Sequence, residues 1–154
     1  QFYPGTLGDL NERTLGKGDV TLDMYDWNYF KTEIEKFRFK NSTSGKSNTS
    51  FIINNKWFPA AHIDHYIAEP LGMHFVAIGN LRDIHTYYWL NNFRKKIKKG
   101  DDAYFITVSN SFTDPHEIYK KKFGKINPPL IIKQYRGNKP VRNILIYLLQ
   151  DYND

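Results

Sequence analysis

The fold is decided by residues 51–109, whose sequence is FIINNKWFPAAHIDHYIAEPLGMHFVAIGNLRDIHTYYWLNNFRKKIKKGDDAYFITVS. Three apolar runs occur in this stretch, at 51–54, 74–78 and 104–108, and helical patterns separate them. Strands that alternate with helical patterns form βαβ units and a parallel sheet. Such sheets hold ligands beyond the carboxyl ends of their strands, so the pattern also indicates where to search for a site.

Two helices are predicted between these strands. The first covers 59–68, because proline suits the first turn of a helix, and Pro70 and Gly72 then end it. The second covers 83–100, where the cations of 94–99 lie at its carbonyl end and favourably meet the helix dipole.

The segment before this stretch predicts another helix, which begins with Asp26 as its N-cap. Trp27, Phe30 and Ile34 recur at helical spacing and form its buried stripe together with Phe37. The small polar residues that follow, NSTSGKSNTS, predict a flexible loop over 41–50.

The segment after it changes rhythm. A short helix is predicted over 115–119, and two apolar runs follow at 129–135 and 143–149. The residues between these runs, RGNKP at 136–140, are typical of a tight turn. We therefore predict an antiparallel hairpin at the edge of the sheet.

Together these elements predict a single α/β domain over residues 22–154. It is Rossmann-like, with three layers and a mainly parallel sheet that carries the C-terminal antiparallel hairpin. Residues 1–21 contain four glycines and little periodicity, which predicts an irregular arm or linker. Because the sequence begins at Gln1 without Met, we expect a processed chain or a piece of a longer one.

Composition narrows the function classes. The chain has 154 residues, no cysteine and a formal net charge of +6, and no run of 18 apolar residues occurs in it. The missing cysteines exclude disulfides, cysteine zinc sites and thiol catalysis. The positive charge suits an acidic partner such as nucleic acid, lipid headgroups or phosphorylated substrates, although a solvated basic surface explains it equally well. No nucleic-acid-binding module is recognisable, so we expect no nucleic-acid partner.

Candidate binding residues follow the predicted strands or lie on the adjoining helices. His62 and His65 share a helix face, but no third ligand has a recognisable spacing, and we expect no metal site. Asparagine and serine after strands are also ordinary turn residues, and a histidine or tryptophan on a helix face can simply pack in the core. The ligand-binding candidates are Asn54, Asn55, His62, His65, Asn80, Arg82, His85, Trp89, Ser109 and Asn110.

Sequence motifs of catalysis are missing after the strands. Neither Gly-x-Gly-x-x-Gly nor a Gly-x-x-x-x-Gly-Lys phosphate loop occurs there, and no Gly-x-Ser-x-Gly elbow occurs in the chain. We therefore expect a binding-type fold with no catalytic residue and no cofactor in this sequence.

The order of several short motifs resembles a known family. DMYDW at 23–27 opens a helix, AHIDHY at 61–66 follows the first strand, YW at 88–89 lies in the next helix, and GDDAYFI at 100–106 enters the third strand. This order is similar to the soluble C-terminal domain of bacterial integral-membrane glycosyltransferases, the dolichyl-phosphate-mannose–protein mannosyltransferase-like and aminoarabinose-transferase-like enzymes. Asp26 departs from the family pattern, which often has glycine there.

The resemblance implies an accessory role. An upstream transmembrane domain of the same polypeptide would bind a polyprenyl-phosphate sugar and transfer the sugar to a protein, lipid or glycan acceptor. The present domain would lie on the periplasmic side of the bacterial inner membrane, against the membrane surface, and no catalytic residue carries over to it. Two alternatives stay open: a stand-alone Rossmann-like enzyme or binding protein for a sugar or nucleotide, and a basic module for nucleic acid.

Overall fold

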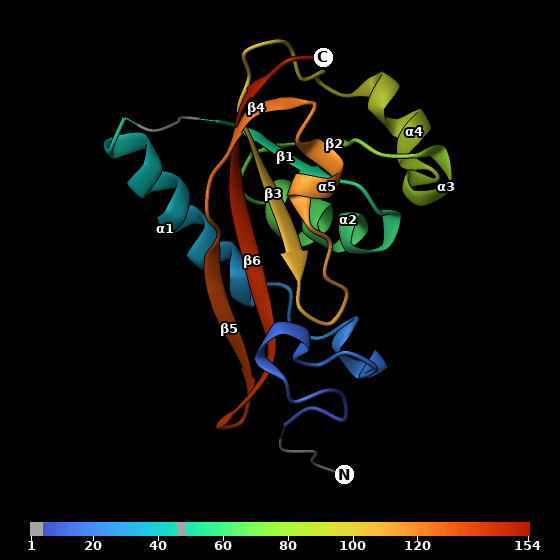
Figure 1. Cartoon of the computed structure of the whole chain (residues 1–154), viewed down its shortest axis with the longest axis vertical. Helices are drawn as coiled ribbons and strands as arrows, with labels where there is room; N and C mark the ends of the chain where they lie inside the picture. Colours follow the sequence, from blue (N-terminus) through green and yellow to red (C-terminus); the bar gives the residue numbers. More distant parts are fainter. Residues whose placement is uncertain (1–4, 46–48) are drawn as a thin grey trace.

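The computed structural model describes residues 5–45 and 49–154. Its central feature is a mixed sheet (Figure 1). Across this sheet, the strands of the described residues lie in the order β2 (His74–Ala77), β1 (Phe51–Asn54), β3 (Ala103–Val108) and β6 (Lys139–Tyr152), followed by β4 (Phe123–Ile126) and β5 (Leu130–Arg136), which both pair with β6.

The strand directions confirm the mixed sheet. β1 pairs in parallel with β2 on one side and with β3 on the other. β6 is antiparallel to β3, β4 and β5, so it alone among the described strands runs against the other five. β5 and then β4 occupy the second edge of β6 in tandem, because β6 is long enough to pair with both. β4 was not predicted, since Gly124 and Lys125 interrupt its apolar pattern.

The helices cover both faces of this sheet. They are η1 (Glu12–Thr14), η2 (Val20–Leu22), α1 (Tyr29–Thr43), α2 (Trp57–Ile63), η3 (Asp64–Ala68), α3 (Leu81–Ile84), α4 (Tyr87–Leu90), η4 (Asn91–Phe93) and α5 (Pro115–Tyr119). α1 lies beside β5, whereas α3 and α4 lie at the opposite side of the molecule, beyond β2 (Figure 1).

Two apolar clusters form the core because successive residues of a strand face opposite sides of a sheet. Ile52 of β1 packs with residues of α1, α2 and η3 in the first cluster. Its neighbours Phe51 and Ile53 pack with Tyr119 of α5 in the second cluster. The partly buried Ile97 also contacts this second cluster. The described chain is therefore a mixed α/β domain with helices on both faces of its sheet.

The helix predicted over 83–100 is wrong in its length. It breaks at His85, whose φ of 46° is left-handed, and no helix covers residues 94–102. α4 ends at Leu90, and Asn91, the first residue of η4, pairs its side-chain amide with the edge of β2, accepting from the N–H of Ala77 and donating to its carbonyl. The basic run 94–99 therefore lies in an extended loop rather than at a helix end.

The helix predicted to begin at Asp26 corresponds to α1, and it differs from the prediction at both ends. It begins after Asn28 rather than at Asp26, whose φ is 38°. It also extends to Thr43, so the start of the predicted loop 41–50 is helical, while residues 46–48 lie outside the described residues. The stripe is confirmed: Trp27, Phe30 and Ile34 are buried.

The N-terminal segment packs against the sheet end to which β3 points (Figure 1). The Ser109 hydroxyl after β3 donates to the carbonyl of Leu15 at 2.6 Å. The Asn143 amide of β6 donates to the carbonyl of Glu12 at 2.9 Å. The proposed boundary between residues 21 and 22 stays a prediction, but the segment before it is fastened to β6 and to the end of β3.

Candidate functional site

A cavity of about 220 Å³ lies at the carboxyl ends of β1 and β3. The chain leaves β1 toward β2, while β3 lies on the other side of β1, so this is the point where an open α/β sheet holds its ligands. The cavity is lined by the start of α2, the turn after β3, the η2 segment and one residue of β6: Gly18, Asp19, Val20, Asp23, Trp27, Phe58, Pro59, Val108, Asn110, Ser111 and Arg142.

The predicted residues after β1 and β3 divide into lining and structural roles. Asn110 lines the cavity, and its buried Oδ1 has no hydrogen-bond partner among the described residues. Asn54 is buried and ties the two strand ends together, since its Nδ2 donates to the Ile106 carbonyl at 2.8 Å. Asn55 is buried beside Gly79. Ser109 bonds to Leu15 and also lines a more apolar cavity of about 620 Å³.

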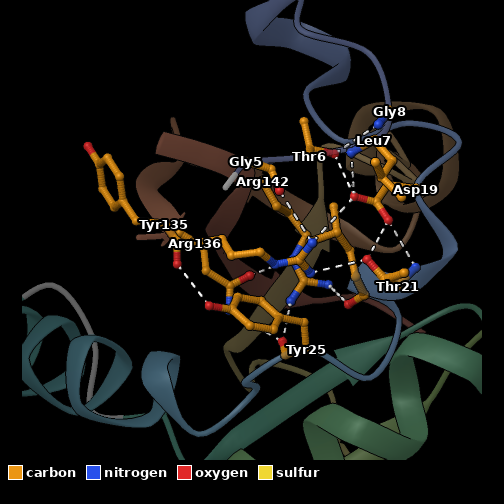
Figure 2. A network of polar contacts seen from close by, with 12 residues as sticks. Gly5, Thr6, Leu7, Gly8, Asp19, Thr21, Tyr25, Tyr135, Arg136 and Arg142 are labelled. Atoms are coloured by element: carbon orange, nitrogen blue, oxygen red, sulfur yellow. Dashed lines mark hydrogen bonds and ion pairs between the residues drawn. The ribbon is translucent and has the colours of Figure 1, made fainter. Parts of the chain in front are cut away.

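Sequence reasoning missed Arg142, the most unusual residue of the site. Its side chain is fully buried. Nε donates to Gln134 Oε1 at 2.9 Å, Nη1 to the carbonyl of Leu22 at 2.8 Å, and Nη2 to the carbonyl of Tyr25 at 2.9 Å (Figure 2). The guanidinium carbon lies 4.7 Å from the centre of the Trp27 indole.

All three acceptors of Arg142 are neutral. Among the described residues, no carboxylate forms an ion pair with this guanidinium. Burial lowers the pKa of Arg142 to about 10, and the nearby Asp23 partly opposes that shift. The side chain therefore stays charged near neutral pH, and the cavity has a buried positive group in its wall.

Two carboxylates also line this cavity, those of Asp19 and Asp23, and they differ in their hydrogen bonds. Asp19 accepts hydrogen bonds from Thr6, from the N–H of Leu7 and from Thr21 (Figure 2). Burial alone would raise the pKa of Asp19, but these hydrogen bonds outweigh it and lower the pKa to about 2. Asp23 uses its backbone carbonyl to accept from the Trp27 indole at 2.7 Å, and its side chain forms no hydrogen bond that the described residues provide.

His62 and His65 are not brought together as a metal site. The buried His62 ring stacks on Trp27 at 5.1 Å and on Tyr66 at 5.9 Å, and burial lowers its pKa. His65 is exposed and faces Glu69 at 3.4 Å. Within the described residues, no group of three or more histidine, aspartate or glutamate side chains is placed to hold a metal ion.

The other candidates lie on the exposed segment after β2. Asn80 precedes α3, Arg82 lies within it, His85 follows it and Trp89 lies in α4, and all four residues are exposed. The His85 ring contacts Trp57 at 5.8 Å. None of these four residues lines the cavity at β1 and β3.

This segment carries a second candidate site, here termed the aromatic–basic surface. Four exposed apolar side chains are followed directly by exposed lysines in the loop after η4. The surface consists of Tyr88, Trp89, Leu90, Phe93, Lys95, Lys96, Lys98 and Lys99. Arg94, between the two groups, is half-buried and pairs with Asp64 at 2.7 Å, which fixes the loop against η3.

Among the described residues, no helix is long and apolar enough to cross a bilayer. No protein-family model, no curated protein and no solved structure matches this chain.

Proposed function

We propose that this chain is a non-catalytic, Rossmann-like extracytoplasmic domain of a bacterial membrane glycosyltransferase. The enzyme would move a sugar from a polyprenyl-phosphate donor to a protein, lipid or glycan acceptor, with catalysis in a transmembrane part outside this sequence. The domain would lie on the periplasmic side of the inner membrane and contact its surface.

The aromatic–basic surface carries this proposal. Trp89 is 64% exposed and Phe93 is 89% exposed, although burial of such side chains is strongly favourable. Tryptophan and tyrosine favour the interface between lipid and water, and each lysine near an anionic bilayer contributes about 1 kcal/mol of attraction. A run of exposed aromatic residues joined to four lysines therefore fits a membrane surface that carries phosphate groups.

Two of the motifs behind the resemblance make contacts at the ends of the sheet. Residues 23–27 supply the carbonyl of Tyr25 and the indole of Trp27 to Arg142. In residues 100–106, the N–H of Gly100 donates to the carbonyl of Tyr152 just before β3. Both motifs thus supply contacts at ends of the sheet.

Vesicle co-sedimentation tests the proposal. The chain is expected to bind vesicles of phosphatidylglycerol and phosphatidylethanolamine and to leave neutral phosphatidylcholine vesicles unbound. Phe93→Ala should weaken this binding roughly fivefold, the effect of about 1 kcal/mol of lost burial. Phe39→Ala is the matched control, because Phe39 is 71% exposed on α1, outside the aromatic–basic surface. Equal effects of the two substitutions would contradict the proposal.

The reading frame upstream of Gln1 provides an independent check. We expect it to encode several transmembrane helices, and a start codon close to Gln1 would argue against the glycosyltransferase assignment.

The alternative function, a binding protein for a sugar or nucleotide, is favoured by a different observation. The cavity at the ends of β1 and β3 occupies the ligand position of open α/β sheets. The cavity and the aromatic–basic surface share no residue, so ligand binding and vesicle binding can be tested separately.

A further inference from the structure

We propose that the cavity at the carboxyl ends of β1 and β3 binds a small hydroxylated oxyanion of the sugar-phosphate type. The proposal rests on the cavity itself and stands independently of the membrane role. The volume of the cavity, about 220 Å³, lies below the roughly 300–1,000 Å³ of pockets for drug-sized ligands, so the expected ligand is comparable in size to a monosaccharide.

Arg142 would hold the oxyanion. A guanidinium has five N–H donors, and three of them bond to Gln134, Leu22 and Tyr25. One N–H on Nη1 and one on Nη2 have no acceptor among the described residues, and an oxyanion in the cavity would supply one. A buried charge is stable only when paired and hydrogen-bonded, and among the described residues the acceptors of Arg142 are neutral.

Asn110 and Asp23 would hold the hydroxyl groups. The buried Oδ1 of Asn110 lacks a donor among the described residues, and a buried acceptor without a donor costs about 1–3 kcal/mol. The Asp23 carboxylate also lines the cavity and can only accept hydrogen bonds when ionised. A ligand with hydroxyl donors satisfies both acceptors, whereas a bare anion leaves Asn110 unpaired and is repelled by Asp23.

The acidic side chains around the cavity determine where the oxyanion and the hydroxyl groups of the ligand would lie. Asp19 is already occupied by Thr6, Leu7 and Thr21, and its side chain also lies 3.9 Å from Arg136. Asp23 is therefore the acidic side chain of the lining that is open to a hydroxyl. This arrangement places the negative group beside Arg142 and the polyol beside Asp23 and Asn110.

Isothermal titration calorimetry with three probes tests the proposal: glucose 6-phosphate, glucose and inorganic phosphate. Glucose 6-phosphate should bind most tightly, because only it provides both the oxyanion and the hydroxyls. Arg142→Met should weaken its binding roughly tenfold or more, the effect of losing a charge-assisted hydrogen-bonded pair. Because this substitution can also destabilise the fold, thermal unfolding of the variant is measured beside it.

Val20 offers a test that leaves the buried network intact. It lines the cavity and is 78% exposed, so either charge is tolerated at this position. Val20→Glu should weaken glucose 6-phosphate binding roughly threefold to tenfold, and Val20→Lys should not weaken it. Glucose, which has no charge, should respond equally to the two variants.

Asp23→Asn separates an anionic ligand from a cationic one. It should tighten the binding of inorganic phosphate, because the repelling carboxylate is gone, and weaken the binding of glucose. Equal affinity of Val20→Glu and Val20→Lys for glucose 6-phosphate, or no binding of any probe at millimolar concentration, would overturn the proposal. Vesicle binding of Val20→Glu should stay unchanged, so failure of this inference is distinguishable from failure of the membrane role.

Discussion

Arg142 joins three parts of the chain through one guanidinium group. It belongs to β6, and it bonds to Gln134 of β5 and to the carbonyls of Leu22 and Tyr25, which lie between the N-terminal segment and α1. Gln134 in turn donates to the carbonyl of Asp26 at 3.0 Å. The network fixes the N-terminal segment to the hairpin while it shapes the wall of the cavity.

Arg142→Met should lower the free energy of unfolding by about 1–3 kcal/mol. The apolar side chain removes a buried charge, but it leaves the Gln134 Oε1 without its donor, and an orphaned buried acceptor is costly. The carbonyls of Leu22 and Tyr25 each lose one donor and keep another, the N–H of Tyr25 and Gln134 Nε2 respectively. Urea unfolding checks this. A loss below about 1 kcal/mol would show that water or a shifted side chain replaces the guanidinium.

Asp19 should make the free energy of unfolding depend on pH in the acidic range. Its folded pKa is about 2, against 3.8 as the ordinary value, so the group is ionised in both states above about pH 5. Its contribution, roughly 2 kcal/mol, is fully present there and is lost as the pH falls from about 4 to about 2. Asp19→Asn should lack this part of the pH dependence, which unfolding free energies measured across that window would reveal. Parallel curves for the two proteins would contradict the assignment.

The sequence identifies candidate binding residues but not the role of each one. Asn54 and Asn110 both lie at the ends of strands, yet Asn54 donates to the Ile106 carbonyl, whereas Asn110 Oδ1 has no hydrogen-bond partner among the described residues. Composition cannot separate them, because the role depends on which backbone group lies within reach after folding. Arg142 was missed since it precedes the apolar run 143–149 and resembles an ordinary turn-flanking charge, whereas two of its three acceptors belong to residues more than a hundred positions earlier.

Among the helices and strands, the apolar pattern predicted those elements whose buried side chains face the core. β1, β2, β3 and the hairpin were predicted within a few residues, because their apolar runs face a core. The segment 83–100 has apolar residues at helical spacing, but its helical part ends at Phe93, and within it Asn91 pairs with the edge of β2. Tertiary context can override helix propensity, and such a hydrogen bond cannot be seen in a local sequence window.

The N-terminal segment is held by close backbone packing at Gly16. A Cβ there would lie 2.5 Å from Leu22 Cδ1 and 2.5 Å from the Val141 carbonyl, and the φ of Gly16 is +84°. Gly16→Ala should therefore cost about 3 kcal/mol, from left-handed strain together with overpacking.

Gly18→Ala is the matched control for this prediction. Its φ is +91°, but open space surrounds the added Cβ, so only the strain of about 1–2 kcal/mol remains. Thermal unfolding of both variants separates the two effects. If Gly16→Ala is no less stable than Gly18→Ala, the segment is not packed on β6 as described.

For the whole molecule, the position of positive charge matters more than its total. The chain carries a net charge of +6, and lysines occur on α1 and in the N-terminal segment as well as on the loop 94–102. The loop differs because its lysines follow exposed aromatic side chains in the sequence, and Ile97 among them contacts the second core cluster. The basic run 120–122 follows α5, which packs in that same cluster, so both runs border one face of the sheet.

Two triple substitutions of equal charge test whether the surface or the total charge binds membranes. Lys96, Lys98 and Lys99 changed to Gln lower the formal charge from +6 to +3, and so do Lys17, Lys31 and Lys40 changed to Gln. Since attraction to an anionic bilayer decays within a Debye length of about 8 Å, only lysines at the contact surface contribute fully. The first triple should reduce binding to phosphatidylglycerol vesicles at least roughly tenfold, because each lysine there contributes about 1 kcal/mol, and the second should change it less than roughly threefold. Co-sedimentation at increasing salt completes the measurement, since salt should weaken the vesicle binding of the unsubstituted chain and of the second triple variant alike. Equal losses for the two triples would mean that the molecule is attracted by its net charge alone, and the aromatic–basic surface would then have no special role.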